Sequence, residues 1–378
     1  MFASVVLLIL SFFDVVFFFI PSPVDPILNS TFEKKTPKFE GALKVNSMLT
    51  KTERLFEGKV FGPESMAVDS KGILYTGLGD GRIVKLEGDK VKEINRTGKQ
   101  VVECGTVEFW SKCGRPLGMR FDRNGINLIV ADAYFGLLEV NPETKVVKIL
   151  LPPATGFNGK PFRFVNHLDI DEDGTIFFTD SSAKWQAHQA SYSFFEGDKT
   201  GRLMAYHLKT GELELLMDGL YFANGVQISP EGDHLLVVEY AASRIMKYYI
   251  KGENKGKSEV FVENLPGYPD NIRPSSSGGY WVAMSMVFTE FNDMLMYSYP
   301  RARNFLAKVF YLPWLVNFAG PNYGLILELD RNGHITRSFQ DPTGSVVPGH
   351  ISEVYDDGNV LYLGSYQSSF LGKLELKD

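Results

Sequence analysis

Oxygen-bearing side chains stand at corresponding points of four segments of this chain, each at the start of an apolar, strand-like run. Carboxylate and amide oxygens form a hard ligand set that suits Ca²⁺. Any one of these residues alone is more typical of a turn, where Asn and Asp satisfy backbone groups. As a set in register, they predict a calcium site. The predicted ligands are Glu64, Asn166, Asn224, Asp270 and Asn271.

The segments belong to a unit that recurs along the chain. Each copy has an apolar strand, a turn with Asp or Ser near Gly, an aromatic-rich strand and then a further strand. Repeats of about 40–50 residues with this pattern are typical of blades stacked around an axis. We therefore predict an all-β, six-bladed β-propeller. The six turn glycines are Gly72, Gly125, Gly174, Gly232, Gly279 and Gly358.

The propeller arrangement gives the five oxygen donors a common position. The inner strands of all blades begin near the central tunnel, so residues at those points converge on the axis. The ring must also be closed, and residues 54–56 are expected to pair with the final strand near 374–376.

The last interval between turn glycines is longer than the others and predicts an insertion in the fifth repeat, at 285–322. It contains many Met, Phe and Tyr residues, partly at helical spacing. One interpretation is a helical cap that packs on the propeller. The other is an apolar lid, or a patch that contacts lipid or acyl substrates.

Residues 1–20 are almost wholly apolar and are followed by Pro21. This length suits a transmembrane helix. A cleaved signal peptide would show a basic start and small residues at its end. Because no Lys or Arg precedes Pro21 and bulky residues 17–20 end the stretch, we favour an uncleaved signal anchor. A stalk at 21–50 and a propeller at 51–378 would follow.

The signals for orientation conflict. The basic residues at 34, 35 and 38 follow the apolar stretch and favour a cytoplasmic body. The sequons at Asn29 and Asn95 accept glycan only in the secretory lumen. We predict a single-pass type II membrane protein, with its body lumenal or extracellular, at the endoplasmic reticulum or plasma membrane.

The cysteines and the net charge give further expectations about disulfide bonding and about binding partners. Cys104 and Cys113 are the two cysteines of the chain. Their close spacing favours one local disulfide, with two unpaired buried thiols as the alternative. The net charge is −6 and no long basic run occurs, so a nucleic-acid partner is not expected.

Longer motifs resemble the strictosidine synthase-like family of six-bladed propellers, which is related to the paraoxonases. The resemblance runs from about residue 23 to the C-terminus. It implies a propeller fold, a type II membrane glycoprotein and an arylesterase-type activity, with calcium held at the positions of the five oxygen donors. The motifs are GPES (62–65), CGRPLG (113–118), VADAY (130–134), FTDSS (178–182), PDNIRPSSSGGYW (269–281) and ISEV (351–354).

The chain departs from this pattern at the catalytic positions. The histidine pair implicated in paraoxonases is replaced by Leu117 and Asp132, so that mechanism is not inherited. The candidate bases are then Asp132 and Asp270. Glu353 takes the place of the glutamate that catalyses amine–aldehyde condensation in strictosidine synthase.

Together with this resemblance, the residues predict a membrane-anchored, calcium-dependent hydrolase of the arylesterase or lactonase type. Its substrate would be a small apolar or aromatic ester or lactone. The first alternative is a non-catalytic propeller with a structural calcium, serving adhesion or signalling. The second is an amine–aldehyde condensing enzyme that works through Glu353. A serine hydrolase is not expected, because no Gly-x-Ser-x-Gly motif is present.

Overall fold

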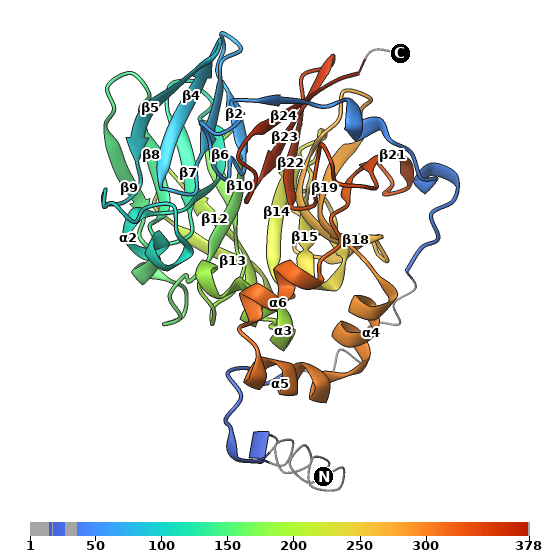
Figure 1. Ribbon diagram of the computed structural model, residues 1–378. Coiled ribbons are helices and arrows are strands. Elements are labelled where there is room, and N and C mark those ends of the chain that lie inside the picture. The colour runs from blue at the N-terminus through green and yellow to red at the C-terminus, as the bar shows by residue number, and fades with distance from the viewer. Residues whose placement is uncertain (1–14, 17, 27–35, 377–378) are drawn as a thin grey trace, which may run out of the picture.

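The strands form six four-stranded antiparallel sheets arranged around a central axis (Figure 1). The computed structural model describes residues 15–16, 18–26 and 36–376. The six-bladed β-propeller predicted from the repeats is confirmed.

Five blades each use four consecutive strands. Blade one contains β2 (Met66–Val68), β3 (Leu74–Gly77), β4 (Arg82–Glu87) and β5 (Lys90–Arg96). Blade two contains β6 (Pro116–Phe121), β7 (Leu128–Asp132), β8 (Gly136–Val140) and β9 (Val147–Leu151). Blade three contains β10 (Val165–Ile170), β11 (Thr175–Asp180), β12 (Gly201–His207) and β13 (Leu213–Leu220). Blade four contains β14 (Ala223–Ile228), β15 (His234–Glu239), β16 (Arg244–Tyr249) and β17 (Ser258–Val262). Blade five contains β18 (Gly267–Pro274), β19 (Tyr280–Val287), β20 (Gly324–Leu329) and β21 (Ile335–Asp341).

The sixth blade joins the two ends of the chain. It contains β22 (Ile351–Asp356), β23 (Val360–Ser365) and β24 (Leu371–Glu375), completed by the N-terminal strand β1 (Glu53–Leu55). In the β1–β24 pair, Arg54 lies opposite Gly372. The predicted closing strand is therefore confirmed, and it ties the last blade to the beginning of the propeller.

Each predicted turn glycine lies between the first and second strands of its blade, at the end opposite the five predicted ligands. Five of them have positive φ angles, which glycine adopts without steric cost. They are Gly72, Gly125, Gly174, Gly232 and Gly358. In blade five, Gly278 takes the positive φ angle instead of its neighbour Gly279.

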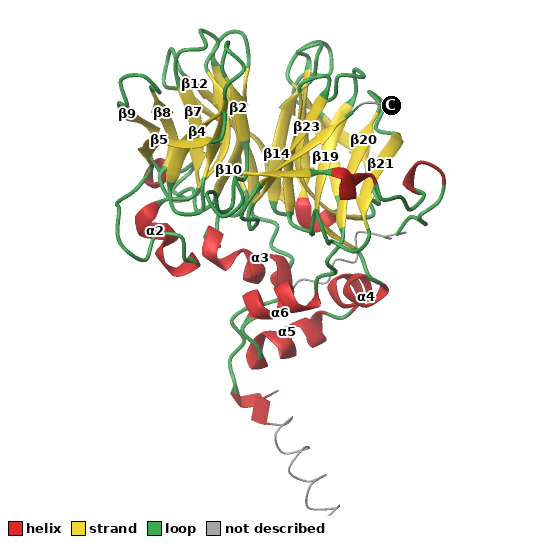
Figure 2. Ribbon diagram, turned by 45° about the horizontal axis from the view of Figure 1, so that its top comes forward, coloured by secondary structure: helices red, strands yellow, loops and turns green. Residues whose placement is uncertain are grey.

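The α-helices α2–α6 gather at one end of the propeller (Figure 2). The α-helices are α2 (Trp110–Cys113), α3 (Ala190–Glu196), α4 (Glu290–Ser298), α5 (Pro300–Val309) and α6 (Leu312–Ala319). The 3₁₀ helices are η1 (Gly41–Leu43), η2 (Met48–Lys51), η3 (Val107–Phe109), η4 (Pro153–Thr155), η5 (Ala187–Gln189) and η6 (Tyr240–Ala242). Helices α4–α6 lie between β19 and β20, in the segment predicted as an insertion. Strand β19 continues to Val287, so residues 285–287 belong to the blade.

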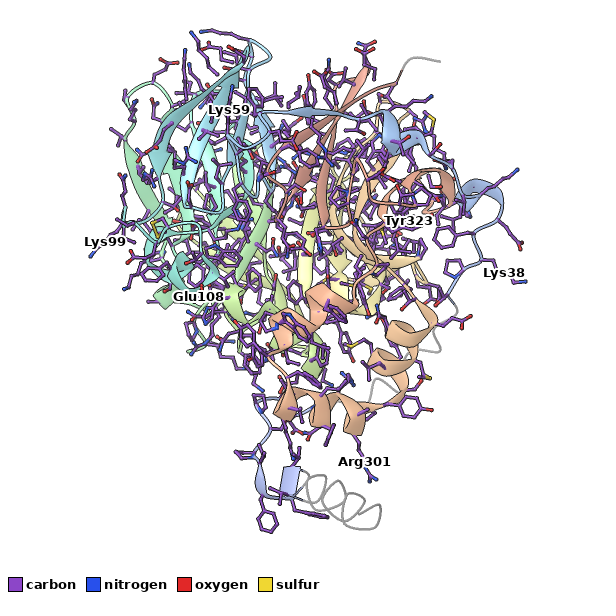
Figure 3. All side chains as sticks on the ribbon, in the orientation of Figure 1. Lys38, Lys59, Lys99, Glu108, Arg301 and Tyr323 are labelled. Atoms are coloured by element: carbon purple, nitrogen blue, oxygen red, sulfur yellow. A yellow bond between two sulfur atoms is a disulfide. The ribbon has the colours of Figure 1, made fainter. Side chains whose placement is uncertain are left out.

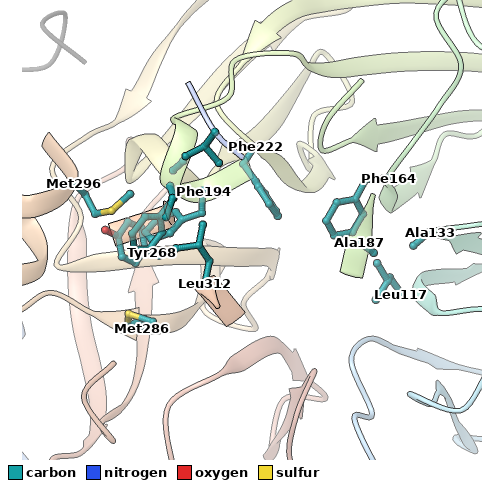
Figure 4. Packing of buried hydrophobic residues seen from close by; sticks show 14 of the residues in the cluster. Leu117, Ala133, Phe164, Ala187, Phe194, Phe222, Tyr268, Met286, Met296 and Leu312 are labelled. Atoms are coloured by element: carbon teal, nitrogen blue, oxygen red, sulfur yellow. The ribbon is translucent and has the colours of Figure 1, made fainter. Parts of the chain in front are cut away.

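The inserted helices are attached to the propeller by an apolar cluster. Leu312 from α6 packs with Phe194 from α3 and Tyr268 from β18 (Figure 4). Tyr268 and Phe194 meet edge to face, with ring centroids 4.7 Å apart. Burial of this cluster fixes the helices on the face where the inner strands begin, so α4–α6 form a cap on that face.

The segment before the propeller is packed rather than extended away from it. In the predicted stalk, Leu43 and Leu49 are buried. The Nε2 of Gln340 in β21 donates a hydrogen bond to the Leu43 carbonyl, 3.0 Å away. Residues 36–50 therefore lie along blade five, because their leucines complete its apolar surface.

The predicted anchor falls largely outside the described residues, since 1–14 and 17 are not among them. The sequon at Asn29 lies outside them as well, whereas Asn95 is in β5. Within the part of the chain that the structure describes, no helix is long and apolar enough to cross a membrane. Cys104 and Cys113 form the predicted disulfide.

Candidate metal and substrate site

The five predicted ligands come together where four inner strands begin. Glu64 precedes β2, Asn166 and Asn224 are the second residues of β10 and β14, and Asp270 and Asn271 lie within β18. All five are buried. The Nδ2 of Asn271 donates to Glu64 Oε1 over 3.2 Å, and Asp270 accepts a hydrogen bond from the Asn224 side chain.

The hydrogen bonds fix which way each amide faces. Asn166 Nδ2 donates to Ser181 Oγ over 2.9 Å, while Ser181 in turn donates to the Ala223 carbonyl. Asn224 and Asn271 likewise use their amino groups on the two carboxylates. Each of the three amides thus commits its nitrogen to the protein and leaves its carbonyl oxygen for another partner.

Those oxygens are buried without hydrogen bonds. Among the described residues, no partner is found for four oxygen atoms of this group, although nearly all buried polar atoms in proteins are paired. They are Glu64 Oε2, Asn166 Oδ1, Asn224 Oδ1 and Asn271 Oδ1. Oxygens in this number, with two carboxylates, fit a hard cation such as Ca²⁺. The described residues contain no cluster of three His, Cys, Asp or Glu side chains, so the amides are essential to any such site.

The two carboxylates are electrostatically unfavourable neighbours. Burial, reinforced by Glu353 and opposed by Arg115, raises the pKa of Glu64 to about 8. Burial and the charge of Glu64 raise the pKa of Asp270 well above its usual value. Two buried acids that resist ionisation together are stabilised as anions by a bound cation.

Small residues allow the inner strands to approach each other at this point. A Cβ atom on Gly225 in β14 would lie 2.7 Å from the Asn271 Cα in β18. A Cβ on Gly364 in β23 would lie 2.3 Å from the Glu64 carbonyl oxygen. Glycine at these positions lets the blades close in and brings the oxygen donors within reach of one another.

A cavity of about 640 Å³ adjoins these residues, and Glu64, Asn166, Asn224 and Asp270 line it. Much of the remaining wall is aromatic or apolar, with Phe164, Phe222 and Trp110 from the propeller face and Val316 from α6. Because apolar walls surround a small polar region, the cavity suits a compact apolar or aromatic molecule with one polar end.

The sequence analysis missed the tyrosines of this cavity. Tyr240 and Tyr366 both line it, and each directly follows the second strand of its blade. Burial raises the pKa of both phenols, so they remain protonated and can donate hydrogen bonds. Tyr366 is 2.7 Å from His350 Nδ1. The repeat register could have identified both residues, because the position after the second strand faces the same end as the ligands.

His188 was also missed. It lines the cavity, and its Nδ1 lies 3.0 Å from the Tyr134 hydroxyl. Burial lowers the pKa of His188, which favours the neutral imidazole. It lies in η5, in the segment between β11 and β12 that is outside the repeat, so no periodic signal marked it.

Asp132 does not line the cavity. Its Oδ2 accepts from the Arg115 amide at 2.9 Å, and its Oδ1 accepts from the amides of Tyr134 and Phe135. Asp180 and Glu239 end the second strands of the next two blades. In the same way, they accept hydrogen bonds from backbone amides just before the first strand of their blade. Asp132 is therefore a structural carboxylate of the repeat, and this placement argues against the catalytic role predicted for it.

Glu353 lies one layer further along the axis than the predicted ligands and does not line the cavity. Its Oε2 is 2.9 Å from Ser65 Oγ and 3.1 Å from His167 Nε2, while its Oε1 lies 3.4 Å from Arg273. Burial alone would raise its pKa, but Arg273, His167 and Arg120 together lower the pKa to about 2. A carboxylate with such a low pKa is a poor proton acceptor, so Glu353 does not take the predicted catalytic position.

His167 is buried within this ion network. Its Nδ1 accepts from the Val226 amide at 3.2 Å, which leaves Nε2–H to donate to Glu353. Burial lowers the pKa of His167 to about 4. The neutral ring thus links blades three, four and six.

Fold and site define a class: six-bladed β-propellers with an all-oxygen, two-carboxylate cradle beside an aromatic cavity. Family models described as "Strictosidine synthase" and "Strictosidine synthase-like, N-terminal" match residues 166–253 and 41–86. The chain belongs to the family of the adipocyte plasma membrane-associated proteins. The rat protein of that name is 44% identical over 94% of this chain and 94% of its own length. The resemblance stated from the sequence motifs is confirmed.

Solved structures share the fold at low sequence identity. A gluconolactonase from Xanthomonas campestris superposes with a TM-score of 0.58 at 14% identity, covering 95% of this chain and 97% of its own. A calcium-binding protein, regucalcin, from Agrobacterium tumefaciens gives 0.54 at 12% identity, covering 85% and 92%. At these identities the similarity establishes the propeller architecture.

Proposed function

We propose that this protein is a calcium-dependent hydrolase of small apolar or aromatic esters or lactones. The observation that carries the proposal is the group of four buried, unpartnered oxygens on Glu64, Asn166, Asn224 and Asn271 beside an aromatic cavity. The gluconolactonase and the calcium-binding regucalcin that share the fold make both the cation and the reaction class reasonable.

Calcium would be held by Glu64, Asn166, Asn224, Asp270 and Asn271. A bound calcium ion supplies electrophilic polarisation of the substrate carbonyl and stabilises negative charge on its oxygen. The aromatic wall holds the apolar part of the substrate and excludes water from it. The protonated hydroxyls of Tyr240 and Tyr366 can donate to substrate oxygens.

Asp270 is the one predicted catalytic candidate that lines the cavity, because Asp132 and Glu353 are committed elsewhere. We assign it the proton transfers. As the water oxygen adds to the carbonyl carbon, Asp270 takes a proton from that water. It then returns the proton to the leaving oxygen as the C–O bond breaks, which gives an acid and an alcohol.

The amine–aldehyde condensation considered from the sequence lacks its catalyst in this arrangement. Glu353 is fully buried among Arg273, His167 and Ser65, away from the cavity. Its low pKa also opposes proton transfer. This chemistry is therefore not part of the proposal.

We also propose that the body lies on the lumenal or extracellular side of the membrane, held by residues 1–20 as a type II anchor. The Cys104–Cys113 disulfide supports an oxidising compartment. Relatives named for plasma-membrane association agree with attachment to a membrane. Mass spectrometry of the protein from mammalian cells would test glycan occupancy at Asn29 and Asn95, and unmodified sequons would argue against this orientation.

Hydrolysis of phenyl acetate by the purified full chain tests the function. We expect turnover with calcium, loss of turnover in EDTA and recovery when calcium is restored. Asp270→Asn should reduce the rate by at least about 100-fold in calcium. Glu172→Gln, the matched change at an exposed position, should have no effect. Calcium binding without turnover on phenyl acetate or aromatic lactones would overturn the hydrolase proposal and favour a non-catalytic propeller.

A further inference from the structure

Large apolar side chains are exposed together on the cap formed by α4–α6. Trp314 is 55% exposed and Phe318 is 76% exposed, and their rings stack with centroids 5.2 Å apart. Exposed apolar patches on a folded protein commonly mark contact with a partner or a membrane. We call this surface the cap face; its residues are Tyr299, Val309, Phe310, Tyr311, Trp314 and Phe318.

Helix α6 has two different apolar sides. Pro313 and Val316 line the cavity, and Leu312 is fully buried in the cluster beneath the cap. Trp314 and Phe318, four residues apart, share the other side of the helix. Packing in the core therefore explains the apolar residues on one side of α6. It does not explain the exposed apolar residues of the cap face. One helix separates the cavity from this outer surface.

The N-terminal segment lies at the same end of the molecule (Figures 1 and 2). Lys308 Nζ in α5 donates to the Val16 carbonyl over 3.3 Å, and Asn304 Nδ2 donates to the Val24 carbonyl over 3.4 Å. Val15 and Phe19 expose large apolar side chains just before Pro21. The apolar surface of the cap face thus continues into the segment predicted to enter the membrane.

The charge of the inserted segment differs from that of the whole chain. Residues 288–323 contain Arg301, Arg303 and Lys308 against Glu290 and Asp293, whereas the whole chain carries a net charge of −6. Arg303 is buried and donates to the Phe195 carbonyl, so it does not contribute to the surface. Arg301 is exposed and extends from α5 at the end where the N-terminal segment lies (Figure 3). A basic side chain beside exposed Trp, Tyr and Phe is the composition of helices that lie in the headgroup region of a bilayer.

We propose that the cap face is a second membrane contact, in which α5 and α6 rest in the headgroup and upper acyl region of a phospholipid bilayer. Its continuity with the N-terminal apolar segment and the exposed Arg301 of α5 favour lipid over a second copy of this acidic chain. The cavity then opens next to the membrane surface, and apolar molecules dissolved in lipid reach it by a short path. Membrane contact by the cap does not require that the cavity be catalytic.

Site-specific fluorescence on the full chain in phosphatidylcholine–phosphatidylserine vesicles tests the proposal. The described residues contain no free cysteine, so a Phe318→Cys variant takes an environment-sensitive label at one position. Ile126→Cys is the control, because Ile126 is also an exposed apolar residue (58%) but lies in the β6–β7 turn at the opposite end. We expect brominated acyl chains to quench the label at 318 several-fold more than the label at 126, with iodide showing the reverse order.

A second variant separates contact by the cap from attachment by the N-terminus. Adding Tyr311→Ser and Trp314→Ser to the labelled Phe318→Cys chain should abolish most lipid quenching at 318 while the N-terminal segment is unchanged. Equal iodide access at 318 and 126 in the parent chain would overturn the proposal. So would shielding at 318 that grows with protein concentration without lipid quenching, since that result would identify a second copy as the occupant.

Discussion

At the scale of single residues, Glu64 and Asp270 bring two buried acids with raised pKa values into one polar region. In the absence of a cation, the wild type must either bury these charges or bind protons at neutral pH, and an amide at position 270 avoids that cost. We expect Asp270→Asn to be more stable than the wild type in EDTA. Its free energy of unfolding should be higher by about 1 kcal/mol or more, and it should unfold at a higher temperature. In calcium the order should reverse, because bound calcium stabilises the wild type by about 2.7 kcal/mol at a hundredfold excess over Kd.

Thermal denaturation of the full chain, followed by circular dichroism in EDTA and in calcium, measures which of the two proteins is more stable in each condition. Glu64→Gln should behave in the same way, and Glu172→Gln should follow the wild type in both conditions. If Asp270→Asn is less stable than the wild type by the same amount with and without calcium, its carboxylate has only a structural role.

Glu353 makes a different prediction, because its carboxylate is paired with cations already present in the chain. Its pKa of about 2 lies below the ordinary 4.5, so its charge stabilises the fold above about pH 4.5. That contribution falls as the pH decreases from about 4.5 towards 2. At neutral pH, Glu353→Gln should cost roughly 3 kcal/mol, because Arg273 and Arg120 lose their buried partner.

Urea unfolding of the wild type and Glu353→Gln across this pH range provides the measurement. The difference in unfolding free energy between the two proteins should shrink as the solution becomes more acidic. A difference that stays constant down to pH 2 would show that the charge of Glu353 is not what stabilises this layer.

The sequence predicted that five oxygen donors come together, and the structure brings them together, whereas Asp132 and Glu353 lie outside the cavity. The five donors could be grouped from the sequence because each stands at a similar register position of a repeat. Asp132 shares that regularity, yet its counterparts Asp180 and Glu239 bind backbone amides, so a repeated acid at a strand end belongs to the fold. For Glu353, only the folded chain brings Arg120, His167 and Arg273 from other blades around it.

At the scale of elements, the geometry of the site depends on how closely inner strands approach. Gly225 in β14, next to Asn224, faces the β18 backbone at Asn271, and the space between them has no room for a methyl group. Gly225→Ala should push the strands apart, reduce stability by about 1–3 kcal/mol and weaken calcium binding. Gly349→Ala, where a Cβ would meet its nearest neighbour at an ordinary 3.4 Å, is the control.

Equilibrium unfolding and calcium titration of both variants distinguish the possibilities. Gly225→Ala with unchanged calcium affinity would mean that the spacing of β14 and β18 does not set the arrangement of the oxygens. Gly349→Ala should match the wild type in both measurements.

Strands were more predictable from the sequence than helices. Turn glycines and alternating apolar residues marked every blade, because these features follow from local backbone geometry. The pairing of β1 with β24 could also be predicted, since an open ring leaves an unpaired edge. The burial of Leu43 and Leu49 was not predicted, because it depends on the shape that blade five presents to them.

At the scale of the whole molecule, the oxygen donors, the cavity and the cap all lie at one end of the propeller. No single blade holds more than two of the predicted ligands, so closure of the ring assembles the site. The other end carries the hairpin turns between first and second strands. This polarity places the cavity towards the surface that we propose contacts the membrane.

The most direct test of this account is calorimetric titration of calcium into the EDTA-treated, dialysed full chain. We predict one ion bound per chain in the axial site, with affinity at least about tenfold lower in Asp270→Asn and unchanged in Glu172→Gln. Absence of saturable binding, or binding that Asp270→Asn leaves unchanged, would contradict the assignment of these oxygens to a cation.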